Sequence, residues 1–327
     1  MKLLFCGLGS IGERHLQNIL NLGYTDVIAY RTRNAPLRTV KATIPTFTSL
    51  SDALKEKPDV AIISNPSSMH VDTAQTLANA GIHLFIEKPL STSQKGLLTL
   101  KKTVKKNNLV VGIGFMLRFH PAILQIKEWI RNDTYGFPIN IHTFWGEYLP
   151  DWHPWEAYET SYAAQTSLGG GPVHTLCHDL DALTDIFGLP STVYANATRP
   201  SSLRLTTDHS VDILCEWERG HTGVVHLDFI CRPPKRAWTI IHDKGRIEFD
   251  YYTNTLKSYH AFPTPTNTSK TFQTFDRNML FIEEIKDFLQ AVNTDTIPRT
   301  SLEDGIDNVR LLVAIDKSLV SHKRVVV

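Results

Sequence analysis

The sequence contains few cysteines, and no two of them are close together. The four thiols, at positions 6, 177, 215 and 231, form no Cys-x-x-Cys pair. A disulfide framework and a structural zinc site are therefore not expected. Such sparse use of cysteine is typical of proteins in the reducing cytoplasm.

An excess of charge of one sign is also lacking. The 34 lysines and arginines against 33 aspartates and glutamates give a formal net charge of +1. Proteins that bind nucleic acid usually carry a basic excess or a basic stripe, and neither is present. No apolar run approaches the roughly 20 residues of a membrane helix. Only four apolar residues follow Met1-Lys2, fewer than a signal peptide needs. We expect neither a nucleic-acid partner nor a membrane partner.

The 327 residues are enough for about two domains. In the first third, short apolar runs alternate with helical patterns. Strands are predicted at 2–6, 27–30, 46–47, 60–64, 83–86 and 109–113, and helices at 11–22, 49–57, 67–80 and 93–106. This alternation predicts βαβ units, and hence an α/β domain over residues 1–120 with a doubly wound parallel sheet and helices on both faces.

After about residue 120 the pattern changes to short strand-like runs joined by turns. Strands are predicted at 139–144, 193–198, 210–217, 222–229, 237–242 and 246–251, helices at 121–131, 173–187, 276–292 and 302–320, and a surface loop at 263–267. This spacing predicts a second α/β domain, residues 121–327, with an open and mostly antiparallel sheet.

The strand at 210–217 has apolar side chains on both faces, because Leu214 interrupts the polar positions Asp212 and Glu216. An open sheet with one uncovered face of this kind would expose a large apolar patch. We therefore expect a homodimer or homotetramer that forms through the second domain.

The first strand is followed directly by Gly7-Leu8-Gly9-Ser10-Ile11-Gly12, which opens a helix. In this context a Gly-x-Gly-x-x-Gly motif binds a dinucleotide. Gly7 permits the tight turn, Gly9 lets the backbone approach a pyrophosphate, and Gly12 lets the helix pack closely. The N–H groups at the helix start, where Ser10 and Ile11 lie, favour phosphates. The alternative is a strand–turn–helix unit with no ligand.

The residues after the second strand indicate which of the two nicotinamide cofactors is preferred. An acidic residue there would bind the ribose hydroxyls of NAD. The sequence instead has Arg31, Thr32 and Arg33. Arginine suits a 2′-phosphate, because its guanidinium makes charge-assisted and often bidentate contacts. NADP is therefore preferred over NAD, and the alternative is that both arginines are solvated loop charges.

Three further segments complete a pattern that covers nearly the whole chain. They are Asn65-Pro66-Ser67-Ser68-Met69-His70, Glu87-Lys88-Pro89, and Gly169-Gly170-Gly171 ahead of His178. With the glycine motif, these segments resemble the Gfo/Idh/MocA oxidoreductase family. The resemblance implies a Rossmann domain followed by an α/β domain with an open sheet. It also implies that NAD or NADP is used to oxidise or reduce hydroxyl groups of sugars, sugar derivatives and polyols.

The resemblance also implies roles for individual residues. Asn65, Pro66, His70, Glu87 and Lys88 are expected beside the cofactor. All of them follow predicted strands, and ligands bind outside the carboxyl ends of the strands in an open α/β sheet. They should therefore line one crevice.

Lys88 and His178 are the predicted catalytic residues. A lysine beside a cationic nicotinamide should have a lowered pKa, and could donate a hydrogen bond to the reacting hydroxyl and relay its proton. Its alternative is a surface lysine. A histidine suits proton transfer near neutrality. The aspartate that the family places before this histidine is missing, and His174 or Thr175 stands in its place. His174 and His178, four residues apart, are expected to share one helix face.

Substrate contacts are expected from Arg118, His174, Thr175 and the aromatic stretch that holds Trp152 and His153. That stretch could equally be a packed loop or an oligomer contact, and Arg118 a hinge residue. The leading prediction is an NAD(P)-dependent oxidoreductase that acts on a secondary alcohol or ketone of a sugar-like molecule. Two alternatives stay open: a cofactor-binding sensor or scaffold without catalysis, and a metal hydrolase built on His153, His174 and His178.

Overall fold

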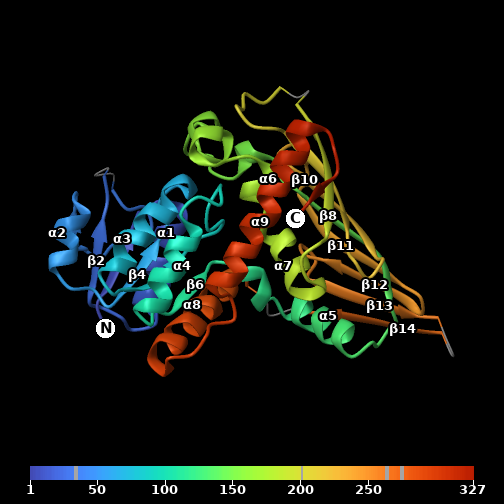
Figure 1. Ribbon diagram of the computed structural model, residues 1–327, viewed down its shortest axis with the longest axis horizontal. Helices are drawn as coiled ribbons and strands as arrows, with labels where there is room; N and C mark the ends of the chain where they lie inside the picture. Colours follow the sequence, from blue (N-terminus) through green and yellow to red (C-terminus); the bar gives the residue numbers. More distant parts are fainter. Residues whose placement is uncertain (33–35, 200–201, 262–264, 273–275) are drawn as a thin grey trace. The chain divides into compact units, whose positions relative to one another are not determined.

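A computed structural model describes the chain apart from residues 33–35, 200–201, 262–264 and 273–275 (Figure 1). The described residues form two compact units. The first contains Met1–Met116 and Arg277–Val309, and the second contains Leu117–Asp276 and Arg310–Val327. The assignment of nucleotide binding to residues 1–120 and of substrate binding to 121–327 stays a prediction of function.

The first unit is built on a six-stranded parallel sheet with the order β3-β2-β1-β4-β5-β6. Its strands are β1 (Leu3–Cys6), β2 (Val27–Tyr30), β3 (Thr46–Phe47), β4 (Val60–Ile63), β5 (His83–Ile86) and β6 (Val111–Ile113). The strands β1 and β4 are buried along their whole length, as expected where helices cover both faces of a parallel sheet. The predicted doubly wound parallel sheet is confirmed.

The helices of this unit come from both ends of the sequence. They are α1 (Ser10–Asn21), α2 (Leu50–Lys55), α3 (His70–Asn79), α4 (Leu97–Lys106) and α8 (Arg277–Thr294), and the short turn η1 (Ser67–Met69) precedes α3. Leu16 and Ile19 of α1 share one apolar core with Ile285 and Phe288 of α8. Helix α8, from near the C-terminal end of the sequence, therefore completes the core of the first unit.

The second unit is built on a nine-stranded sheet with the order β14-β13-β12-β11-β7-β10-β9-β8-β15. Its strands are β7 (Pro138–Gly146), β8 (Thr192–Thr198), β9 (Ser210–Glu216), β10 (Thr222–Asp228), β11 (Lys235–His242), β12 (Gly245–Asp250), β13 (Thr255–His260), β14 (Thr266–Thr271) and β15 (Val325–Val326). All neighbours are antiparallel except β7 and β10. The predicted mostly antiparallel sheet is confirmed.

The helices of the second unit lie along one face of this sheet (Figure 1). They are α5 (Pro121–Arg131), α6 (Pro172–Thr175) and α7 (His178–Phe187). The last helix, α9 (Leu302–Ser321), begins in the residues of the first unit and ends in those of the second. Along β9 the side chains alternate between buried and exposed, so that Val211 and Ile213 are buried while Leu214 is 37% exposed. The face without helices in this unit thus carries apolar side chains.

Two predictions of local structure are wrong. The helix predicted at 173–187 is two helices, because Leu176, with φ −98° and ψ 25°, interrupts the helical backbone after α6. His174 and His178 therefore do not share the face of one helix. The loop predicted at 263–267 is a strand in its last two residues, since Thr266 and Asn267 begin β14. Residues 263–264 lie outside the described part of the chain.

Candidate functional site

The carboxyl edge of the parallel sheet brings the predicted cofactor residues into one row. Strands β2, β1, β4 and β5 are neighbours in that order. Arg31 follows β2, the glycine turn follows β1, Asn65 and Pro66 lie just beyond β4, and Glu87 follows β5. Backbone hydrogen bonds continue the ladder past the strand ends: Gly7 N–H to the Tyr30 carbonyl at 3.0 Å, Ser64 to Cys6 at 2.9 Å, and Glu87 to Ile63 at 2.9 Å.

The three glycines of the turn have separate physical roles. Gly7 has φ +98°, and a Cβ there would lie 2.8 Å from the backbone nitrogen of Asn65. A Cβ on Gly12 would lie 2.5 Å from Ser64 Oγ and 2.6 Å from the Gly7 carbonyl oxygen. A Cβ on Gly9 would meet nothing within 4 Å. The fold therefore requires Gly7 and Gly12, whereas Gly9 faces open space.

Helix α1 begins directly after Gly9, beside the open space that this glycine faces. Gly9 is its N-cap residue, and no side chain caps the first turn. The N–H groups of the first helical residues, Ser10 and Ile11 among them, have no partner within the helix, and the helix dipole places partial positive charge there. This combination fits the pyrophosphate of a dinucleotide.

Residues after β2 continue the same edge. The Arg31 N–H donates to the Phe47 carbonyl at 2.9 Å, which aligns the chain beyond the strand. Arg31 is half-buried and Thr32 is exposed. Arg33, the second predicted phosphate ligand, lies outside the described residues. Arg31 is the described one of the two predicted phosphate ligands, and its guanidinium suits a phosphate group.

His70 links the loops that follow β4 and β5. Its side chain is buried, its Nδ1 lies 2.9 Å from the Pro89 carbonyl oxygen, and its Nε2 lies 2.8 Å from that of Asn65. Burial lowers the pKa of His70, against the opposing effect of both carbonyl contacts. The Lys88–Pro89 peptide bond is cis. Through this ring the segment that carries Lys88 is held beside the segment that carries Asn65.

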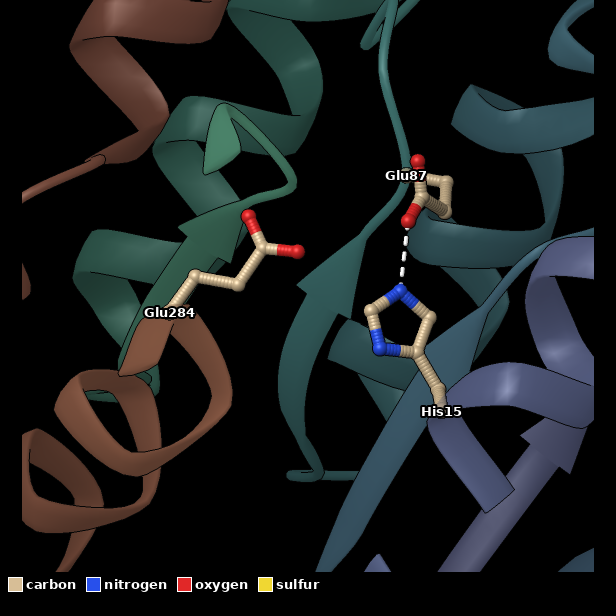
Figure 2. Close-up of side chains that lie close together, drawn as sticks. All are labelled: His15, Glu87 and Glu284. Atoms are coloured by element: carbon tan, nitrogen blue, oxygen red, sulfur yellow. Dashed lines mark hydrogen bonds and ion pairs between the residues drawn. The ribbon is translucent and has the colours of Figure 1, made fainter. Parts of the chain in front are cut away.

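Glu87 is almost fully buried under the end of β5. Its Oε1 lies 2.5 Å from Nε2 of His15 (Figure 2). Its Oε2 accepts from the Lys88 backbone N–H at 3.1 Å. Burial raises the pKa of Glu87, but the hydrogen bond and charge of His15 and the charge of Lys88 outweigh it and lower the pKa overall. A Cβ on Gly114 would lie 3.1 Å from the carboxylate, so this glycine leaves room for it. Glu87 thus positions the backbone of the half-buried Lys88.

In the second unit His178 begins α7, and its ring centroid lies 5.9 Å from that of Trp145. The next residue, Asp179, accepts from Arg236 Nε at 3.0 Å and from Trp238 Nε1 at 2.5 Å. These buried contacts fix the first turn of α7 on the sheet, and hence the place of His178.

Arg118 holds the same helix further along. It donates to Asp181 from Nε at 2.9 Å and from Nη2 at 2.7 Å, and its Nη1 lies 3.2 Å from Asp185. Its side chain is 3% exposed. Arg118 thus anchors α7, and both its predicted substrate contact and the hinge alternative stay predictions.

His174 has a carboxylate partner that the sequence did not indicate. Its Nε2 lies 3.0 Å from Asp316 Oδ2 on α9, 142 residues away. An acid thus lies beside His174, although the nearby family aspartate is missing. Thr175, the other residue aligned with that position, is buried.

The aromatic stretch does not form one uniform surface. Trp145 is buried and donates to Glu147 at 2.8 Å, and Trp152 packs edge-on against Phe229 with ring centroids 5.5 Å apart. His153 lies beside Trp155, which is 58% exposed. Trp145 belongs to strand β7, and the packed-loop interpretation fits Trp152, while Trp155 and His153 stay candidates for contact with a ligand or a partner.

Among the residues that the structure describes, the histidine–acid group close enough to share a metal ion is His15, Glu87 and Glu284. The hydrolase alternative needs His153, His174 and His178 together, and within the described chain they form no such group. Every helix in the described part of the chain is too short or too polar to span a membrane.

Comparison with known proteins identifies the fold. Residues 1–115 match the family model described as an oxidoreductase family with an NAD-binding Rossmann fold, and residues 123–248 match the GFO/IDH/MocA C-terminal domain. The chain belongs to the Gfo/Idh/MocA family. As a member of that family it is an NAD(P)-dependent oxidoreductase, and the predicted resemblance is confirmed.

Two curated relatives extend over most of the chain. D-xylose 1-dehydrogenase (NADP(+)) 2 of Haloferax volcanii is 25% identical over 279 residues, which cover 84% of this chain and 83% of that protein. UDP-N-acetylglucosamine 3-dehydrogenase of Acidithiobacillus ferrooxidans is 26% identical over 332 residues, which cover 96% and 95%. The solved structure of levoglucosan dehydrogenase in complex with NADH and levoglucosan has the same fold, with a TM-score of 0.86, 18% identity and coverage of 100% and 99%.

The glycine geometry predicts opposite effects for two alanine substitutions. Gly9→Ala should leave the thermal unfolding midpoint unchanged, because its Cβ enters open space. It should weaken dinucleotide binding at least about tenfold, or about 1.4 kcal/mol, because that space is where the pyrophosphate would lie. Gly12→Ala should lower the midpoint even without cofactor. Unfolding curves and titrations of nicotinamide fluorescence measure both. Wild-type affinity in Gly9→Ala would contradict this placement of the pyrophosphate.

Proposed function

We propose that this oxidoreductase interconverts a secondary alcohol and a ketone on a sugar, sugar nucleotide or polyol-like substrate, with NADP(H) preferred over NAD(H). The observation that carries the proposal is the row of strand ends in which the open turn at Gly9 and the lysine at position 88 lie on one sheet edge. The names of the relatives support the substrate class, since they act on D-xylose, on UDP-N-acetylglucosamine and, in the similar structure, on levoglucosan.

Different residues along this sheet edge bind different parts of the cofactor. The N–H groups at the start of α1 bind the pyrophosphate, and the Arg31 guanidinium binds a 2′-phosphate. Asn65 and Pro66 line the cofactor site beyond β4. His70 holds this segment beside the segment that carries Lys88. A bound nicotinamide dinucleotide supplies the hydride donor or acceptor.

Lys88 handles the proton in this proposal. In the oxidative direction its amine accepts the proton of the substrate hydroxyl as the hydride leaves the same carbon, and in the reductive direction the ammonium returns it. Glu87 holds the backbone of Lys88 through its N–H. His178, fixed by the anchoring of α7, is the second proposed acid–base group. The His174–Asp316 pair supplies a histidine with an acidic partner in the same unit, which weakens the case for an inactive sensor.

We also propose that copies of the chain associate through the uncovered face of the nine-stranded sheet. Tyr194 and Leu214 are direct cross-strand neighbours on β8 and β9, and they are 41% and 37% exposed. Ile139 and Ile241, on β7 and β11, are exposed as well. A homodimer or homotetramer would cover this apolar surface. The sparse cysteine usage supports a cytoplasmic location.

The role of Lys88 predicts a large loss of rate without loss of cofactor. Lys88→Met keeps most of the side-chain volume and removes the amine. It should lower kcat by about 10²–10⁴-fold while NADP affinity stays nearly constant. His178→Asn should lower kcat and remove the limb of the pH–rate profile that reports the histidine. Lys95→Met, which changes an exposed lysine of the same unit, is the control. A fully active Lys88→Met enzyme would rule out the proposed proton path.

The role of Arg31 predicts a change in cofactor preference. Arg31→Ala should weaken NADP binding by about 1.5–3 kcal/mol, the contribution of a charged hydrogen bond, and should leave NAD binding nearly unchanged. Calorimetric titration with both cofactors measures the difference, and Lys41→Ala tests an exposed charge nearby. If the wild type binds both cofactors equally and the variant does the same, the preference for NADP is wrong.

The exposed sheet face predicts the oligomeric state. Light scattering at micromolar concentration should give a dimer or tetramer. Leu214→Glu should reduce the mass, because it places a charge on the sheet face that lies in the proposed interface. Leu98→Glu changes a leucine of α4 that is 72% exposed and should have no effect. A monomeric wild type would overturn the proposal.

A further inference from the structure

Glu284 is a buried acid that has no part in the function proposed above. Glu284 lies on the apolar face of α8, is 1% exposed, and both of its carboxylate oxygens are buried with no hydrogen-bond partner among the described residues. Figure 2 shows its side chain extending from α8 toward the His15–Glu87 pair. One ligand atom of each of the three residues lies within 4.8 Å of the others.

The spacing within this cluster argues against a metal ion. Two donor atoms at about 2.0–2.2 Å from one zinc ion in tetrahedral geometry lie roughly 3.3 Å apart. Nε2 of His15 and Oε1 of Glu87 are 2.5 Å apart, so they are bonded to each other through a proton. The rings of Phe85 and Phe281, with centroids 5.3 and 5.9 Å from that of His15, make the surroundings apolar. The cluster therefore suits the binding of protons rather than of a metal ion.

The charges that face Glu284 determine which carboxyl keeps a proton. Glu87 has His15 and the Lys88 N–H as partners, and its pKa is lowered overall. Burial raises the pKa of Glu284 well above its usual value, and the negative charge of Glu87 raises it further, while Lys88 acts in the opposite direction. Two neighbouring carboxyls in unequal environments separate in this way, one ionised and one neutral.

We propose that Glu284 is a positioning residue that stays protonated, so that a single negative charge, that of Glu87, faces Lys88. This inference rests on the proposed function, in which Lys88 exchanges the substrate proton. A second ionised carboxylate at this place would stabilise the ammonium form of Lys88 and hold its proton. With Glu284 neutral, the ammonium form of Lys88 is stabilised less, so the lysine can both accept and return a proton.

The neutrality of Glu284 is tested first without any reaction. A group whose pKa is higher in the folded than in the unfolded chain stabilises the fold fully below its unfolded pKa of about 4.3, and this contribution is lost as the pH rises toward the folded value. Glu284→Gln has the same size and cannot ionise. Its unfolding midpoint relative to wild type should therefore rise between pH 5 and pH 9, by about 2 °C or more.

The matched control is Glu283→Gln, which removes the exposed acid next in sequence. Its midpoint relative to wild type should not depend on pH in this way. Glu284→Met should show the same upward trend as Glu284→Gln, even if its midpoint is lower at every pH. A difference between Glu284→Gln and wild type that stays constant from pH 5 to pH 9 would overturn the proposal.

The coupling to Lys88 is tested next, through the pH dependence of kcat/KM. If Glu284 is neutral, Glu284→Gln should leave the midpoint of the Lys88 limb within about 0.3 units, whereas Glu87→Gln should lower it by about 1–3 units. A comparable lowering in Glu284→Gln would show an ionised Glu284 and contradict the inference. If Lys88→Met stays active, the proposed proton path fails, while the unfolding result still decides whether Glu284 is neutral.

Discussion

The hydrogen bond between His15 and Glu87 joins the two parts of the sheet edge on which the proposed chemistry depends. His15 lies on the helix that begins at the glycine turn, and Glu87 precedes Lys88. Both side chains are buried, so removing either partner would leave a polar group uncompensated in an apolar core. The start of α1 and the backbone of Lys88 are therefore fixed relative to each other. Close packing at Gly12 and the space at Gly114 make this contact possible.

A similar principle operates along the rest of the edge and in the second unit. The ring of His70 links the loops after β4 and β5 through the carbonyl oxygens of Asn65 and Pro89, and so helps to fix the segment that carries Lys88. In the second unit, Asp179 and Asp181 on α7 bind Arg236 and Arg118. Such buried ion pairs are weak evidence of a net gain in folding stability. They still fix one position of the helix, because losing either partner would leave a buried charge uncompensated. His178 lies at the start of the helix held in this way.

The sequence was informative where burial enforces a pattern. The strands of the parallel sheet are continuous apolar runs, because both faces are covered, and they were predicted closely. The strand β14 reads Thr-Asn-Thr-Ser-Lys-Thr and is exposed throughout, so it pairs by its backbone and gives no alternation to detect. The break between α6 and α7 at Leu176 is not predicted, because the helical spacing of apolar residues continues across it. The placement of Asp316 and Glu284 is not predicted by the sequence, because the residues beside them, His174 for Asp316 and His15 and Glu87 for Glu284, are distant along the chain. The one signal for Glu284 was an acid within the apolar stripe of Leu280, Phe281, Ile285 and Phe288.

That stripe also explains why the acid at position 284 is neutral. An ionised carboxylate without hydrogen bonds in an apolar environment is so unfavourable that such groups take up a proton instead. A second, independent effect comes from Glu87, since its negative charge raises the pKa of the neighbouring Glu284 carboxyl. Both effects come from the packing of α8 against α1 and β5, which brings residues 284, 15 and 87 into one core. The charge that faces Lys88 therefore depends on a helix from the far end of the chain, and any substitution that loosens α8 would let water reach Glu284 and favour its ionisation.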